Sequence, residues 1–446
     1  HGLTEPLLYD PLVPIAEPMV KWAVEVHRLE DLPMIVRRAA KIATTPPTGP
    51  VFISLPGDIL NNEAGIDLGA SSRLVTQVRP DDATIKAMAE RIIKAKNPVI
   101  IAGDELVKSD ALEIAAEFAE AIGAAAYQQS VGYGSHFLAE SACYLGSLSR
   151  DQKSVRDLLA PHDLMIALGS DPIRMSVYSE IDPKPDELPV VHVGLVDWDI
   201  AKNFAVEIGI KADVRTTLEA LVPAIREIGG AQHADVARSR VDDLKTRNWS
   251  AKRETLTARI SSLGDVRPID PDWLSLAVAE TLPENGVLVN EGLTSSRHLT
   301  DLRPYRDRHD YHALASGGIG WGLPASIGVA IAQAPRPVCC FSGDGSAMYS
   351  IQSLWTAANM KLPITFVIAN NGGYRIIKQR LLAFNGNAQF VGMDFNDPYI
   401  DFTMMAQSLG VPGQRIEDPG ALRGALEESF ATPGPKLLEV MVDGTV

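Results

Sequence analysis

One segment near the end of the chain, residues 338–371, restricts the fold more than any other. It contains an apolar strand, then Gly-Asp-Gly-Ser at 343–346, then a helical stretch and a second apolar strand that ends in Asn370-Asn371. Four apolar residues at helical spacing predict the buried face of the helix: Ile351, Leu354, Trp355 and Ala358. Two strands joined through one helix lie parallel in the same sheet. The segment therefore predicts a βαβ unit whose polar residues, after each strand, meet at one edge.

The same alternation of strands and helices runs through most of the 446 residues, which predicts an α/β protein with parallel sheets flanked by helices. This length suggests two or three domains. We expect four segments: 1–62, 80–235 as a central Rossmann-like domain, 236–262 as a linker helix, and 263–446 as the last domain. Residues 1–62 hold one helix and one strand, too little for a core, and they begin without Met. We therefore expect the first domain to be incomplete.

Charge and cysteine content narrow the class of partner and the compartment. Lys and Arg number 41 against 56 Asp and Glu, a net charge of −15, which disfavours nucleic acid and anionic membranes as partners. No apolar stretch is long enough for a membrane span. Three cysteines cannot form a disulfide framework, so we expect a cytoplasmic protein.

The side chains at the predicted sheet edge favour a metal site. Asp344 and Asn371 offer hard oxygen donors without Cys or His, a set that suits Mg²⁺ with phosphate oxygens in its shell. Gly345 allows the backbone to approach an anion, and the amides near Ser346 open a helix. A turn with an Asp cap followed by an Asn-rich loop is the simpler alternative. The 24 residues between Gly345 and Asn370, enough for one helix and one strand, favour the metal site.

The spacing of GDGS and NN resembles the signature of thiamine-diphosphate (ThDP) enzymes. The whole chain resembles the ThDP-dependent 2-oxo-acid decarboxylase and acetolactate synthase family, nearest to benzoylformate decarboxylase-like members. That family has a pyrimidine-binding, a central and a diphosphate-binding domain, which would make 1–62 a pyrimidine-domain remnant and 263–446 the diphosphate-binding domain. The resemblance implies Mg²⁺ ligands at Asp344, Asn371 and the Gly373 carbonyl. It also implies cofactor contacts at eight residues: Leu293, Thr294, Gly317, Ile319, Gly345, Ser346, Asn371 and Tyr374.

Within that site, the Gly317 carbonyl would accept the cofactor's 4′-amino group, and Ile319 would support its bent form, although plain core packing is the alternative for Ile319. The implied reaction is nonoxidative decarboxylation of a 2-oxo acid, with carboligation of the enamine intermediate as a second outcome. An acetolactate synthase-like transferase and a noncatalytic ThDP-fold binding module are the alternatives. The family also implies a homodimer or homotetramer. Neither the particular 2-oxo acid nor its acceptor follows from the sequence.

Three departures from the family pattern bear on activity. The activating Glu of the family would lie before the first residue of this chain, so no catalytic residue is assigned. Where benzoylformate decarboxylases offer aromatic residues, "YRIIKQRLLAF" offers Ile376, Ile377, Gln379 and Arg380. Lys378 and Arg380 could meet an anionic substrate group or be ordinary exposed helix charges. FAD, which acetolactate synthases bind, is doubtful here because "SDPIRMSVYS" replaces the expected stretch. His298, His309 and His312 lack a metal-ligand spacing.

Overall fold

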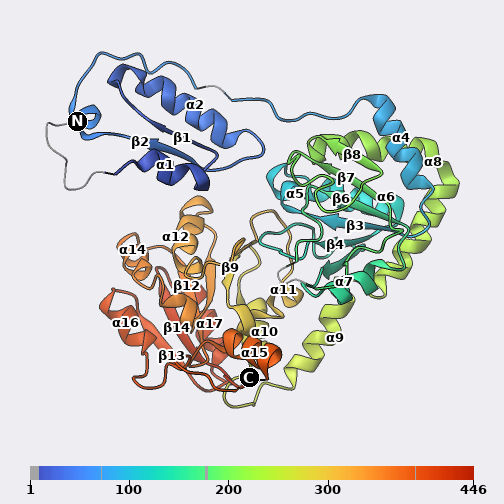
Figure 1. Ribbon diagram of the computed structural model, residues 1–446. Helices are drawn as coiled ribbons and strands as arrows, with labels where there is room; N and C mark the ends of the chain where they lie inside the picture. The colour runs from blue at the N-terminus through green and yellow to red at the C-terminus, as the bar shows by residue number, and fades with distance from the viewer. Residues whose placement is uncertain (1–9, 72, 176–178, 387) are drawn as a thin grey trace.

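The structure, a computed structural model, describes residues 10–71, 73–175, 179–386 and 388–446 (Figure 1). Their strands form three parallel sheets: a two-stranded sheet, β1-β2, and two six-stranded sheets, ordered β5-β4-β3-β6-β7-β8 and β10-β9-β11-β12-β14-β13. The strand bounds are Trp22–Glu25 (β1), Val51–Ser54 (β2), Pro98–Ala102 (β3), Ala125–Gln128 (β4), Tyr144–Ser147 (β5), Leu164–Leu168 (β6), Val190–Gly194 (β7), Ile208–Lys211 (β8), Val287–Glu291 (β9), Tyr311–Ala313 (β10), Val338–Gly343 (β11), Ile364–Asn370 (β12), Gly413–Ile416 (β13) and Lys436–Met441 (β14). The predicted α/β class with parallel sheets is confirmed.

Helices cover both faces of the larger sheets, as parallel connections require. Their bounds are Leu12–Ala16 (α1), Leu32–Thr44 (α2), Gly57–Asn61 (α3), Asp82–Ile93 (α4), Asp104–Lys108 (α5), Leu112–Ile122 (α6), Gln152–Leu159 (α7), Val214–Lys245 (α8), Trp249–Ser261 (α9), Pro271–Thr281 (α10), Leu299–Leu302 (α11), Gly322–Ala332 (α12), Asp344–Ala347 (α13), Ser353–Asn359 (α14), Arg375–Asn385 (α15), Phe402–Ser408 (α16) and Leu422–Ala431 (α17). Three 3₁₀ turns are Glu17–Met19 (η1), Leu29–Asp31 (η2) and Leu293–Ser296 (η3). Among the described residues, no helix combines the length and apolarity needed to cross a membrane.

The expected single linker helix at 236–262 is wrong in detail. The range holds the end of α8 and the whole of α9. The helix α8 starts at Val214 but is interrupted by non-helical backbone at Gly230, where φ is +56°, so its last part begins just before the range. Asn248 separates the two helices because its side chain accepts the backbone N–H of Ala251 and so starts a new helix. The division into 1–62, 80–235, 236–262 and 263–446 stays a prediction, and residues 1–9 of its first part lie outside the described residues.

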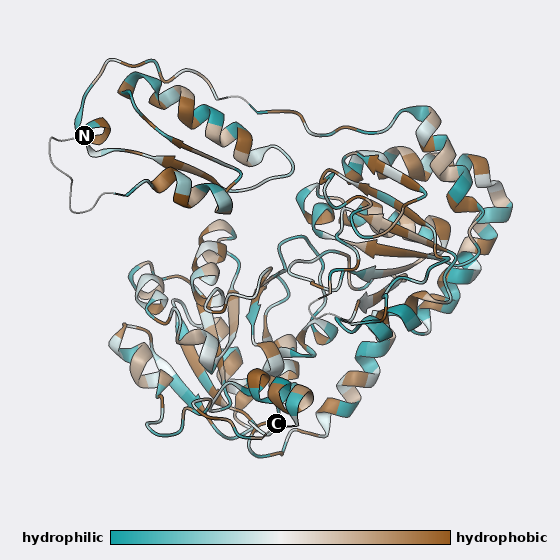
Figure 2. Ribbon diagram, viewed as in Figure 1, coloured by the Kyte–Doolittle hydropathy of each residue, from teal (hydrophilic) through white to brown (hydrophobic). Residues whose placement is uncertain are grey.

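The apolar side chains gather into three separate clusters. The largest runs from the central sheet into α10 and one face of the last sheet, and includes Ile100, Leu276 and Phe341. A second cluster covers the other face of the last sheet. The third, beside the two-stranded sheet, has only Val26, Ile35 and Ile59 as buried members. Figure 2 shows the strands of the central sheet as mostly hydrophobic, which is typical of strands buried on both faces.

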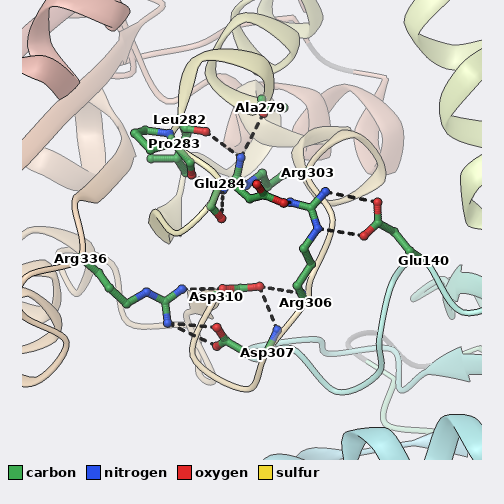
Figure 3. A network of polar contacts seen from close by, with 10 residues as sticks. All are labelled: Glu140, Ala279, Leu282, Pro283, Glu284, Arg303, Arg306, Asp307, Asp310 and Arg336. Carbon is green, nitrogen blue, oxygen red and sulfur yellow. Dashed lines mark hydrogen bonds and ion pairs between the residues drawn. The ribbon is translucent and has the colours of Figure 1, made fainter.

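A polar network fixes the loop that precedes β10 (Figure 3). The buried Arg303 guanidinium donates to the carbonyl oxygens of Leu282 at 2.7 Å and Glu284 at 3.0 Å, and also to those of Ala279 and Pro283. These carbonyls lie at and just beyond the C-terminal end of α10, where backbone acceptors have no helical partner. Arg303 therefore caps α10 with a positive charge at the favourable end of the helix dipole.

Replacing Arg303 with Met should destabilise the protein, because the carbonyl oxygens of Ala279, Leu282 and Glu284 would lose their donor in a buried place, whereas that of Pro283 would keep the Gly286 N–H. We expect the thermal unfolding midpoint to fall by about 5–10 °C. The matched control is Arg306→Met in the same loop, because the Arg306–Glu140 pair, at 2.8 Å, is about half exposed and such pairs contribute little. Equal shifts for the two variants in differential scanning calorimetry would contradict the capping role.

Candidate active site

The polar residues after β11 and β12 lie side by side, as the sequence predicted. The two strands pair in parallel with Gly343 opposite Ala369, so Asp344 and Asn371 follow at the same edge of the sheet. The connection between them differs from the predicted single helix, because it is split into α13 and α14. Ile351 and Leu354 are buried, but Trp355 is 58% exposed and does not belong to the buried face.

The Asp344 carboxylate ties the two strand ends together. One oxygen accepts the N–H of Gly345 at 2.7 Å, and the other accepts those of Asn371 and Gly373, both at 3.1 Å. Burial raises the pKa of Asp344, and these backbone hydrogen bonds act in the opposite direction. The side chain is 2% exposed, so its charge is held by backbone dipoles rather than by water.

Asn371 carries an oxygen that the protein leaves without a partner. Its Oδ1 atom is buried and accepts no hydrogen bond, which is costly unless a ligand satisfies it. Asp344, this amide oxygen and the nearby Gly373 carbonyl form an all-oxygen donor set. The set fits Mg²⁺, since one protein carboxylate leaves charge to be balanced by phosphate oxygens.

Glycines let aromatic rings and backbone close around this loop. A Cβ atom at Gly345 would lie 2.7 Å from the ring of Tyr374, and one at Gly373 would lie 2.3 Å from the carbonyl oxygen of Met393. The Tyr374 ring meets Phe395 edge to face at 4.7 Å. Ser346 is buried at 4% exposure. The structure thus places Gly345, Ser346, Asn371, Gly373 and Tyr374 together.

Glu291, which sequence reasoning did not assign, joins two further predicted segments. Its buried carboxylate accepts the N–H groups of Gly320 at 2.7 Å and Gly322 at 2.6 Å. Gly320 directly follows Ile319 and lies three residues after Gly317. Ile319 is partly buried, whereas Gly317 is exposed with open space around it. The "NEG" triplet in the sequence was the available signal, because an acid ending a buried strand needs donors.

Leu293 has an unusual backbone conformation beside Glu291. Its φ angle is +47°, which is rare for a residue with a Cβ atom, and its side chain is 41% exposed. Backbone strain of this kind is concentrated at functional sites. Leu293 and the partly buried Thr294 begin η3 and follow the end of β9, one strand from β11. The structure therefore brings them to the same sheet edge as Asp344.

Comparison with known proteins decides the family. Residues 294–440 match "Thiamine pyrophosphate enzyme, C-terminal TPP binding domain", and residues 85–221 match "Thiamine pyrophosphate enzyme, central domain". The chain belongs to the thiamine-diphosphate enzyme family. The predicted resemblance and the ThDP-enzyme architecture are confirmed.

Several relatives cover nearly the whole chain. It is 28% identical to benzoylformate decarboxylase of Pseudomonas aeruginosa over 96% of this chain and 76% of that protein. It is 26% identical to acetolactate synthase 2, chloroplastic, of Nicotiana tabacum over 98% of this chain and 66% of that protein. Among solved structures, it resembles the Rhodococcus jostii 4-hydroxybenzoylformate decarboxylase, with a TM-score of 0.83 at 25% identity, covering 97% of this chain and 78% of the other.

The helix α15 carries the residues that the sequence analysis considered for the substrate side of the site. Ile376 and Gln379 are partly buried on α15, whereas Ile377 and Arg380 are exposed. Lys378 is buried and forms an ion pair with Asp394, so it is neither an ordinary exposed charge nor free to meet a substrate. Of the two cations that the sequence analysis considered as contacts for an anionic substrate group, only the exposed Arg380 remains.

A cavity of about 370 Å³ lies at the carboxyl edge of the central sheet and is lined by Glu105, Tyr133 and Lys202, among others. The crevice between the neighbouring strands β3 and β6 is where a nucleotide would bind. Close to this crevice, the buried carboxylate of Glu105 on α5 accepts the backbone N–H groups of Leu195 at 2.7 Å and Val196 at 3.1 Å, which follow β7. The doubt about FAD stays a prediction from the sequence. Residues 176–178, inside the stretch that made FAD doubtful, lie outside the described residues.

The three histidines considered from sequence do not assemble a metal centre in the described part of the chain. His298 lies 3.1 Å from the Asp301 carboxylate, and burial lowers the pKa of His312. Across the described ranges, no group of three or more His, Cys, Asp or Glu residues is placed to hold a metal ion. The Asp344–Asn371 loop is therefore a candidate metal site because of its oxygen donors, and not because several charged side chains gather there.

A buried network behind the metal loop holds Asn370, which sequence reasoning also left without a role. The Asn370 Oδ1 atom accepts the N–H of Gly372, and its Nδ2 atom donates to the Glu439 carboxylate at 2.8 Å. Glu439 is fully buried and also accepts from Tyr399 and, at 3.2 Å, from Arg415. Gly372 has a φ of +73°, so this network fixes the turn that presents Asn371 and Gly373.

Replacing Glu439 with Gln should loosen the loop, because an amide donor would face donors from Asn370 or Arg415. We expect Mg²⁺ affinity in the presence of ThDP to fall about 5- to 20-fold, corresponding to roughly 1–2 kcal/mol. Isothermal titration with Mg²⁺ measures this directly. The control is Glu427→Gln, the same chemical change at an exposed position of α17, and equal affinities for the two variants would contradict the positioning role.

Proposed function

We propose that this protein is a ThDP- and Mg²⁺-dependent lyase that decarboxylates a 2-oxo acid without oxidation. The observation that carries the proposal is the unpartnered Asn371 Oδ1 atom beside the buried Asp344 carboxylate. The oxygen donors of that loop fit a magnesium ion that bridges to a diphosphate. Benzoylformate decarboxylase and 4-hydroxybenzoylformate decarboxylase among the relatives support the reaction type.

Each part of the site has a defined task in this proposal. Asp344, Asn371 and the Gly373 carbonyl would hold Mg²⁺, while Gly345 and Ser346 would meet the diphosphate and Tyr374 would cover it. When bound, ThDP supplies the electron sink that lets carbon dioxide leave.

The other cofactor contacts come from the segment that Glu291 anchors and from η3. The Gly317 carbonyl would hold the cofactor's amino group, Ile319 would support its shape, and Leu293 and Thr294 would lie near the diphosphate. These residues bind and orient the cofactor and exclude water.

A carboligating transferase is the second candidate. It is favoured by acetolactate synthase of Nicotiana tabacum and glyoxylate carboligase of Escherichia coli O157:H7, both similar over nearly the whole chain. The two functions differ only in what captures the product of decarboxylation.

A panel of 2-oxo acids distinguishes the candidates. We expect carbon dioxide release that requires both ThDP and Mg²⁺, with an aldehyde as the main product by chromatography. An acetohydroxyacid formed from pyruvate would favour the transferase. ThDP binding without turnover of any substrate, in the full-length protein, would instead indicate a noncatalytic binding module.

We also propose that the protein is a homodimer or homotetramer and that it works in a reducing, cytoplasmic compartment. Large apolar side chains near the site are open to solvent in the single chain, with Tyr349 61% and Trp355 58% exposed. A second subunit would cover such a surface, and closed symmetry is the usual outcome. Cys143, Cys339 and Cys340 are all buried free thiols, which accords with a reducing environment.

Replacing Asp344 with Asn should remove Mg²⁺-dependent ThDP binding. The substitution keeps the shape but removes the only charged donor of the set, so affinity should fall at least about 100-fold. Quenching of tryptophan fluorescence during ThDP titration provides the measurement. Asp401→Asn, which changes a helix cap in the same sheet unit, is the control, and unchanged affinity in Asp344→Asn would contradict the metal assignment.

A further inference from the structure

A cavity of about 650 Å³ lies between the carboxyl edges of the two six-stranded sheets. The last sheet contributes Leu293 and Thr294 after β9 and Ile376 from α15. The central sheet contributes Ser130 and Arg150, which follow β4 and β5. The cavity thus begins at residues proposed to touch the cofactor and ends on a different part of the fold.

The acidic residues that line this cavity are already partnered within the chain. Glu291 accepts backbone amides, as described above. Asp270 caps α10 by accepting the N–H of Asp272 at 2.7 Å, and Asp272 pairs with Arg259 at 3.4 Å and Arg297 at 3.6 Å. Asp443 accepts from Thr445. None of these carboxylates needs a ligand to be satisfied.

Arg150 differs from the other charged residues of the cavity. Its one hydrogen bond within the described residues is a long one, 3.4 Å, from Nε to the carbonyl oxygen of Ser130. It forms no ion pair with any described carboxylate, so the two terminal nitrogens of its guanidinium are available. A guanidinium with a free edge binds carboxylate in a bidentate manner.

Polar groups near Arg150 favour the same kind of ligand. The Asn290 Nδ2 atom donates to the Tyr311 hydroxyl at 3.1 Å, and both residues line the cavity. Burial raises the pKa of Tyr311 to about 12, and the nearby positive charge of Arg150 acts in the opposite direction. The Tyr311 hydroxyl therefore stays protonated and can donate a hydrogen bond within the cavity that Arg150 also lines.

We propose that Arg150 binds a second carboxylate of the substrate, which makes a 2-oxo dicarboxylic acid the substrate class. This inference rests on the proposed decarboxylase function and specifies it further. Leu293 and Ile376 would contact the short aliphatic part of such a substrate, between its keto group and its distal carboxylate. The sequence analysis found the aliphatic Ile376 and Ile377 on α15 where benzoylformate decarboxylases offer aromatic residues. These aliphatic side chains are consistent with a substrate that has an acyclic carbon chain.

The first test compares two substrates of equal chain length, 2-oxoglutarate and 2-oxopentanoate, in the ThDP- and Mg²⁺-loaded protein. We expect kcat/KM for carbon dioxide release to favour 2-oxoglutarate at least 20-fold. Arg150→Gln should reduce that preference at least tenfold, mainly through KM for the dicarboxylate. Arg297→Gln, the same change at a cavity residue already paired with Asp272, should alter the preference less than threefold.

Equal use of the two substrates by the unmodified protein, or an unchanged preference in Arg150→Gln, would overturn the proposal. Failure of both substrates while another 2-oxo acid is decarboxylated would also overturn it, while leaving the decarboxylase function intact.

A second measurement does not require turnover. Glutarate, a dicarboxylate without the keto group, should raise the thermal unfolding midpoint of the unmodified protein, whereas pentan-1-ol, which has the same chain length but no carboxylate, should not at the same concentration. The shift should disappear in Arg150→Gln and persist in Arg297→Gln. If no 2-oxo acid is decarboxylated but this pattern appears, the proposed function fails and the carboxylate site stands. If glutarate gives no shift in the unmodified protein, the carboxylate site fails.

Discussion

A single buried carboxylate organises the site of this protein. Asp344 receives backbone N–H groups from its own strand end and from the loop after the neighbouring strand. Without these donors, a charge at 2% exposure would be strongly unfavourable. The loop in turn depends on the carboxylate, because the amides of Asn371 and Gly373 have no other described acceptor that orients them so. The protein therefore fixes the positions of the proposed metal ligands before any ion binds.

Two more buried acids, Glu291 and Glu439, also hold neighbouring segments by accepting hydrogen bonds. Glu291 holds the amides that follow Ile319, and Glu439 holds the side chain of Asn370. Each converts a flexible, glycine-rich segment into a fixed one by satisfying several donors at once. The site is thus a set of backbone segments held in place by buried carboxylates, and the proposed metal ion and cofactor would bind on these segments.

The sequence predicted the parallel sheets and the meeting of Asp344 with Asn371 because those features follow from strand–helix–strand order and side-chain type. It did not predict Glu291, Asn370 or Glu439, whose partners lie about 30 to 70 residues away and become visible only in three dimensions. It placed Trp355 on a buried face because spacing alone cannot show where a helix is interrupted. It left Lys378 open between solvent and substrate, whereas its position is decided by Asp394, a residue on a separate segment.

The pairing of β11 with β12 also has an evolutionary consequence. Asp344 and Asn371 are held at the same sheet edge by the hydrogen-bonded ladder from Val338 and Ile364 to Gly343 and Ala369, not by the number of residues in the connection. Insertions or deletions within 347–363 would leave the two ligands in place, provided that the ladder keeps its alignment. A shift of one residue in the ladder would instead turn the wrong side chains toward the metal. Length variation between the two motifs should therefore be tolerated among descendants of this protein, whereas slippage between the strands should not.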